Sequence, residues 1–81
     1  MKVVVLFFAA ARERAGAERR VVEMPAGATV ATLWKRLADE TPALAPVLAT
    51  SRAAVDEEFA PTTTPLRDGA VVAVLPPVSG G

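Results

Sequence analysis

Apolar residues along the chain fall into segments whose length and spacing predict a small domain of helices and strands. Residues 3–8, Val-Val-Val-Leu-Phe-Phe, are β-branched, aliphatic and aromatic, as is typical of a strand. Residues 9–15 predict a short helical turn that ends before Gly16. Residues 19–24 predict a second strand that stops at Pro25, so the first two strands form a hairpin-like pair with a long connection.

The clearest helix begins after Thr29, a residue type that caps helix N-termini. Apolar residues then recur at helical spacing on one face, and charged residues occupy the other. The apolar face comprises Val30, Leu33, Trp34 and Leu37, and the solvent face comprises Lys35, Arg36, Asp39 and Glu40. We interpret Trp34 as a core residue rather than part of a ligand site. Pro42 ends the helix because proline disfavours helical backbone at the preceding residue.

The second half of the chain predicts shorter elements. In order, these are a helix at 44–49, a strand at 52–55, a strand in or beside Phe59, a loop at 62–65, a turn at Asp68-Gly69 and a last strand at 71–75. We find no repeat, linker or second domain. The chain therefore divides into one domain, residues 1–75, and a C-terminal tail, residues 76–81.

This order of elements predicts an α+β fold in which a mixed sheet packs on one main helix. The two apolar strands near the ends of the chain are expected side by side in the centre. That is the β-grasp arrangement, although the periodicity alone is compatible with several α+β folds. Both strands are apolar on both faces, whereas strands of a sheet with one solvent-exposed face alternate apolar and polar residues. Either the second short helix covers the far face, or that face docks a partner.

Composition restricts the chemistry available to the chain. Its 81 residues are 52% hydrophobic and 22% charged, which suits one small domain with a dense core. There is no Cys and no His, so thiolate ligands and the commonest general base are missing, and we expect no bound metal or cofactor. An independent enzyme is a poor interpretation of such a chain.

Charge and hydropathy restrict its partners. Nine basic and nine acidic residues cancel, whereas a nucleic-acid binder of this size carries a basic excess. The longest apolar run, residues 3–11, is too short to span a bilayer and does not resemble a secretion signal. We therefore expect a cytoplasmic protein that binds neither nucleic acid nor membrane.

The candidate chemistry lies in the last six residues, Pro76-Pro77-Val78-Ser79-Gly80-Gly81. Two prolines stop the last strand and favour extended backbone, and six extended residues reach at most ~20 Å. Two glycines can pass through a channel too narrow for other residues, which leaves the carboxyl group of Gly81 as the working group. A Gly-Gly end alone is also typical of a frayed terminus. The diproline and the lack of conventional catalytic groups favour a working tail.

These residues resemble a known family, the small subunit of molybdopterin synthase. The specific feature is Pro-Pro-Val-Ser-Gly-Gly at the terminus, preceded by Asp68-Gly69 and by Val-Val-Ala at 71–73. The opening Leu-Phe-Phe-Ala at 6–9, Arg12-Glu13, Gly16, and Ala-Thr-Val at 28–30 with Leu33 resemble the same family, so the similarity covers the whole chain. Two departures lie outside the tail: Asp56, where the family often has Asn, and Ala70, where an acidic residue is usual.

The resemblance implies a ubiquitin-like β-grasp fold and a sulfur-carrier cycle. An enzyme similar to ubiquitin-activating enzymes would use ATP to adenylate Gly81, and sulfur would replace one oxygen to give a thiocarboxylate. The tail would then enter the large subunit of a heterotetrameric synthase and donate sulfur to cyclic pyranopterin monophosphate. The partner-binding residues implied are Phe8, Phe59, Leu75, Arg12, and the tail residues Pro76, Pro77, Val78, Ser79 and Gly80.

Three other interpretations share parts of this pattern. A related carrier for thiamine or tRNA thiolation would use the same tail chemistry with a different acceptor, and the Pro-Pro-Val-Ser segment argues against it. A ubiquitin-like protein modifier would share the activation step and form isopeptide-linked adducts. A β-grasp interaction module with an idle tail would keep its function without Gly80 and Gly81.

Overall fold

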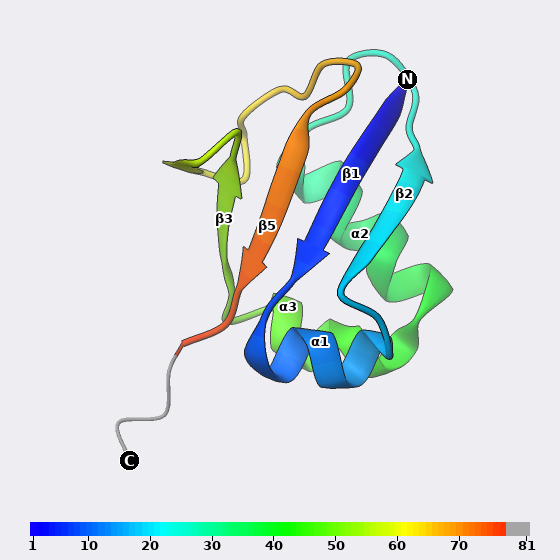
Figure 1. Ribbon diagram of the computed structural model, residues 1–81. Coiled ribbons are helices and arrows are strands. Elements are labelled where there is room, and N and C mark those ends of the chain that lie inside the picture. Colours follow the sequence, from blue (N-terminus) through cyan, green and yellow to red (C-terminus); the bar gives the residue numbers. More distant parts are fainter. Residues whose placement is uncertain (78–81) are drawn as a thin grey trace.

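The two apolar segments near opposite ends of the chain lie side by side, as the sequence predicts (Figure 1). In the computed structural model, which describes residues 1–77, β1 (Lys2–Phe7) pairs in parallel with β5 (Val71–Leu75). β2 (Arg19–Glu23) runs antiparallel to β1, and β3 (Arg52–Val55) runs antiparallel to both β5 and β4 (Glu58–Ala60). The strand order β2-β1-β5-β3-β4 confirms the predicted β-grasp fold.

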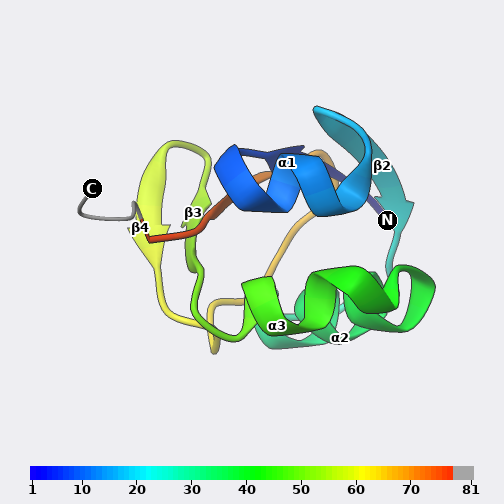
Figure 2. The same ribbon diagram turned by 90° about the horizontal axis from the view of Figure 1, so that it is seen from below.

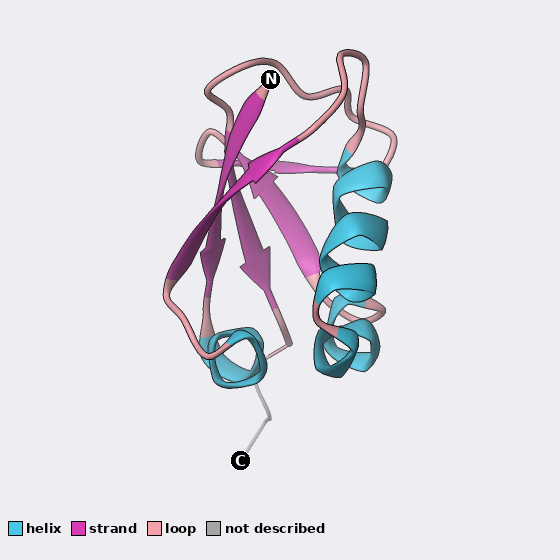
Figure 3. Ribbon diagram, turned by 90° about the vertical axis from the view of Figure 1, so that its right-hand side faces the viewer, coloured by secondary structure: helices cyan, strands magenta, loops and turns pink. Residues whose placement is uncertain are grey.

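The helices leave one face of this sheet open. α2 (Val30–Glu40), the 3₁₀ turn η1 (Pro42–Leu44) and α3 (Ala45–Leu48) lie on the same side of the sheet (Figure 2). α1 (Ala9–Ala15) lies at the end of the sheet where β1 stops (Figure 3). The short helix predicted at 44–49 is α3, a single α-helical turn that directly follows η1. It packs beside α2 and does not cover the far face.

Side chains from both layers form one core. Alternation along the central strands sends every second residue inward. The inward residues of β1 and β5 are Val3, Val5, Phe7, Val72 and Val74, and α2 adds Val30, Leu33 and Leu37. Trp34 is half-buried and packs against this core, which confirms its interpretation as a core residue. Within residues 1–77, none of the helices is long and apolar enough to cross a membrane.

The start of α2 is fixed by reciprocal hydrogen bonds between two threonines. The Thr32 amide donates to Oγ1 of Thr29 at 3.3 Å, and the Thr29 amide donates to Oγ1 of Thr32 at 3.2 Å. This is a capping box in which Thr replaces the more usual Glu or Gln, and it satisfies two backbone donors. The predicted N-cap is confirmed, and it sets where the apolar face of α2 begins.

Loss of this cap should destabilise the domain. We expect Thr29→Ala to lower the free energy of unfolding by about 1 kcal/mol, because a backbone donor at the helix start loses its side-chain acceptor. Thr63→Ala is the matched control, because Thr63 is an exposed loop residue. Chemical denaturation of both variants measures the difference. Equal stability of the two variants would contradict the role assigned to the cap.

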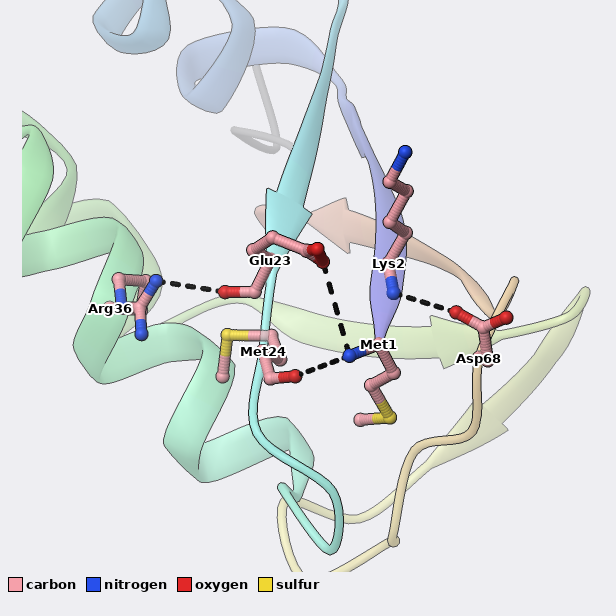
Figure 4. Close-up of polar contacts among 6 residues, drawn as sticks. All are labelled: Met1, Lys2, Glu23, Met24, Arg36 and Asp68. Carbon is pink, nitrogen blue, oxygen red and sulfur yellow. Dashed lines mark hydrogen bonds and ion pairs between the residues drawn. The ribbon is translucent and has the colours of Figure 1, made fainter.

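Polar contacts tie the end of the sheet that is remote from the tail. The Met1 ammonium group donates to the Met24 carbonyl at 2.8 Å and lies 3.9 Å from a carboxylate oxygen of Glu23 (Figure 4). The Lys2 amide donates to the Asp68 carboxylate at 2.7 Å. Arg36, predicted to face water, also donates to the Glu23 carbonyl at 2.8 Å. These contacts join both edges of β1, and the Arg36 contact joins β2 to the middle of α2.

The β3–β4 hairpin explains why Asp56 can stand where the family often has Asn. Asp56 and Glu57 form its turn with φ of 48° and 72°, a left-handed region that Asp tolerates better than most residues. The Asp56 amide donates to the Val71 carbonyl at 2.8 Å, and its carboxylate accepts from the Val71 amide at 3.0 Å. An acceptor oxygen is therefore sufficient there. Ala70, the second departure, is buried.

Candidate functional site

The tail begins where β5 leaves the centre of the sheet. β5 ends at Leu75, and Pro76 and Pro77 follow it outside any helix or strand, as predicted. Pro76 is half-buried and Pro77 is exposed. The predicted site residues Val78, Ser79, Gly80 and Gly81 lie outside the described residues, so their roles stay predictions. What the structure describes is the surface from which the tail starts.

That surface is the face of the sheet without helices. The outward side chains of β1 and β5, Val4, Leu6, Val71, Ala73 and Leu75, are only half-buried. Strand register places Leu6 beside Ala73 and Ala73 beside Ala54, and Ala54 beside Phe59. An apolar row therefore crosses four strands, and we call these seven side chains, together with Phe8, the open face. Its exposure favours the second of the two predicted alternatives, a docking surface.

Two aromatic rings stand out at its margins. Phe59 in β4 is 62% exposed, and Phe8, just beyond β1, is 46% exposed. Phe8 and Leu75 each lie one residue beyond a register pair, Phe7 with Val74, so both emerge at the same level of the sheet. The structure thus places three predicted partner-binding residues around the point where the tail departs.

Arg12, the fourth predicted contact residue, lies apart from this group on α1. Its guanidinium forms an ion pair with Glu18, and both side chains are mostly exposed. The two residues line an open hollow of about 570 Å³ together with Gly16 and others. The Arg12 backbone amide donates to the Phe8 carbonyl at 3.3 Å. Within residues 1–77, however, the only ion pair of the Arg12 side chain is with Glu18, so its role in partner binding stays a prediction.

One residue of this region was missed by the sequence analysis. Arg52 is the register partner of Leu75, and its guanidinium carbon lies 3.8 Å from the centroid of the Phe59 ring. Arg52 and Phe59 also line a hollow of about 380 Å³, and Phe59 lines a second hollow of about 790 Å³. The alternation of Arg52 with the buried Ala53 was a signal that it faces outward. Its stacking on Phe59 depends on the β3–β4 pairing, which no local pattern reveals.

We expect Phe59→Asp to weaken partner binding far more than folding. An aromatic side chain that becomes buried in an interface often contributes about 2 kcal/mol or more, which corresponds to about 30-fold in affinity. Folding should change little, because the ring is mostly in water. Calorimetry with the partner, alongside thermal melts, measures both effects.

Val21→Asp is the comparison variant for this substitution, because Val21 is an exposed apolar residue of the same sheet face, beside Val4, but lies on the far edge strand β2. Equal losses of binding in both variants would mean that docking covers the whole sheet. A collapse of the Phe59→Asp melt would place the ring in the core instead.

Comparisons of sequence place this geometry among known proteins. Residues 5–81 match the ThiS family. The molybdopterin synthase sulfur carrier subunit of Chlamydomonas reinhardtii is 36% identical over 83 residues, covering 100% of both chains. The protein of the same name from Mycobacterium tuberculosis is 38% identical over 82 residues, covering 100% of this chain and 99% of the relative.

Solved structures share the fold. SAMP1 from Haloferax volcanii has a TM-score of 0.89 at 27% identity, covering 100% of both chains. A complex of subunits 1 and 2 of the molybdopterin-converting factor from Helicobacter pylori contains a chain with a TM-score of 0.71 at 28% identity, again covering 100% of both chains. In that protein, a chain of this fold assembles with a second subunit.

Proposed function

The chain belongs to the ThiS family, and from this premise we propose that it is the sulfur carrier subunit of a molybdopterin synthase, with the carboxyl group of Gly81 as its sulfur-bearing group. The supporting observation is a family match that continues through the tail to residue 81, together with a central strand that ends directly before the diproline. Full-length relatives carry the name of this subunit.

The proposed cycle begins with activation of the carboxylate. A carboxylate resists nucleophilic attack because its charge is shared by two oxygens. Attack of the Gly81 carboxylate on the α-phosphorus of ATP would expel pyrophosphate and leave an acyl-adenylate, whose carbonyl carbon carries AMP as a good leaving group. A separate adenylating enzyme would perform this step. A sulfur nucleophile would then displace AMP and give the thiocarboxylate.

The domain would serve this chemistry by delivering the tail to the large subunit. The open face would dock on the large subunit in the cytoplasm, while the tail enters its active site and passes sulfur to cyclic pyranopterin monophosphate. The chain would supply no general base and bind no cofactor of its own, and ATP would be consumed by the activating enzyme. The synthase, and not this subunit alone, would therefore be the enzyme, and its two subunit types would form a heterotetramer.

Intact mass of the protein tests this proposal. The chain is incubated with an adenylating enzyme of the family, ATP and hydrosulfide, and then with the large subunit and cyclic pyranopterin monophosphate. We expect the mass to rise by the difference between sulfur and oxygen in the first step and to return in the second. A chain that remains unmodified while a known sulfur carrier is converted would overturn the proposal.

The likeness to SAMP1 favours a second candidate function, because solved structures of this fold include a small archaeal modifier protein. In a modifier, a lysine amine would attack the acyl-adenylate in place of sulfur and leave an isopeptide bond. Proteomic analysis of cells that express the chain separates the two functions. Lysines joined by an isopeptide bond to the C-terminal peptide that follows Arg67 would favour the modifier, and the thiocarboxylate without such adducts would favour the carrier.

A further inference from the structure

The positively charged guanidinium group of Arg52 lies close to the start of the tail and has no acidic partner in the part of the chain that the structure describes. Five of the other arginines are engaged: Arg14 donates to the Ala43 carbonyl, and ion pairs are formed by Arg12, Arg20, Arg36 and Arg67. Within residues 1–77, Arg19 on the far edge strand β2 likewise has no ion pair. Within residues 1–77, no carboxylate lies within ion-pair distance of Arg52. Its guanidinium instead lies over the Phe59 ring.

Stacking of this kind leaves the guanidinium available. A guanidinium is planar and carries its five N–H donors around its edge, so a ring against its flat face blocks none of them. The same donors match the two oxygens of a carboxylate. Phe59 thus contacts only the flat face of the Arg52 guanidinium, and Arg52 lines the hollow of about 380 Å³ beside the ring.

The strand residues around the open face are more basic than the rest of the molecule. Lys2 precedes the buried Val3, and Arg19 is the register partner of Leu6, so both face outward with Arg52. The acidic residue of the same strand faces is Glu23, which is the register partner of Lys2 and lies close to the Met1 ammonium group. These four account for three of the nine basic and one of the nine acidic residues, which leaves six basic and eight acidic residues elsewhere. The strands of this face therefore carry two more basic than acidic side chains, although the chain as a whole has no net charge.

We propose that Arg52 binds a carboxylate of the large synthase subunit, so that charge as well as apolar contact directs the docking of the open face. The inference rests on the proposed function and specifies the chemistry of its partner: an apolar surface that carries an acidic side chain close to the entry of the tail. Charge complementarity of this kind raises association rates and fixes orientation. Orientation matters here because Arg52 is the register partner of Leu75, the last residue before the tail.

Binding of the large subunit at two salt concentrations tests the role of Arg52. We expect Arg52→Gln to weaken binding about tenfold at about 0.1 M salt and much less at about 1 M, where the Debye length falls from about 10 Å to about 3 Å. Arg52→Lys retains the charge and should retain most of the salt dependence of the wild type. Lys35→Gln is the control, since it removes an exposed charge from α2, outside the sheet, and should leave binding unchanged.

The outcomes separate the inference from the function on which it rests. Arg52→Gln that binds as the wild type does, or that loses equal affinity at both salt concentrations, would overturn the inference and leave the carrier function standing. A wild-type chain that does not bind the large subunit would overturn both. Thermal melts of each variant show whether a binding loss reflects unfolding.

Discussion

A chain that lacks Gly81 is expected to fold normally and to transfer no sulfur. The terminal carboxyl group of Gly80 would then lie one residue short of its place, by up to about 3.5 Å. Misplacement of a reacting atom by about 1 Å can already cost about 100-fold in rate, so the loss should be complete in practice. Stability should change by no more than about 0.5 kcal/mol, because every buried side chain of residues 1–77 lies at or before Val74.

Thiocarboxylate formation and sulfur transfer are measured separately, by intact mass and by single-turnover synthesis of the dithiolene product. A chain with one alanine added after Gly81 is the matched control for length, since it keeps both glycines and moves the carboxyl group outward. It should be equally inactive. Synthase activity in either variant would rule out the carrier role, and loss of the folded state in the shortened chain would show that the tail is structural.

Gly80 is expected to show the second large effect, through its lack of a side chain. Gly80→Ala should fold as the wild type does but react slowly in both steps, and Gly80→Phe should be nearly inactive. The tail must enter two active sites, one that adenylates and one that transfers sulfur. A side chain occupies room in both, and it also removes the positive φ angles that glycine alone adopts readily.

Adenylation is assayed by mass spectrometry, and transfer is assayed with protein that already carries the thiocarboxylate. Ser79→Ala is the matched control, because it adds no bulk at a position that already has a Cβ atom, and it should retain most activity. Gly80→Phe that passes both steps at the wild-type rate would contradict the narrow-channel argument and favour a terminus that only frays.

Local signals in the sequence predicted most of the secondary structure correctly. The apolar runs at 3–8 and 71–75 became β1 and β5, and the Thr29 cap with Pro42 bounded α2. The short helix predicted at 44–49 is α3, and the 3₁₀ turn before it, which begins at Pro42, was not predicted. Such features are readable because capping, proline geometry and periodicity act over a few neighbouring residues.

The candidate site could be predicted only in part. Phe8, Phe59 and Leu75 were identified through the family resemblance, and the structure places them around the start of the tail. Arg52 was missed, because its importance comes from contact with a residue on a neighbouring strand. Arg12 was also named through the family resemblance; it pairs with Glu18, and its role in partner binding stays a prediction.

The sequence by itself determined the elements, the apolar character of the central strands and the chemical identity of the tail, because each depends on residue type and short-range spacing. Tertiary structure alone decided which face of the sheet stays open. Both faces of β1 are apolar in sequence, and only the packing of α2 and α3 on the same side leaves Val4 and Leu6 outward. Strand pairing likewise decided that Arg52 meets Phe59 and Leu75, because contacts across a sheet depend on register between distant segments.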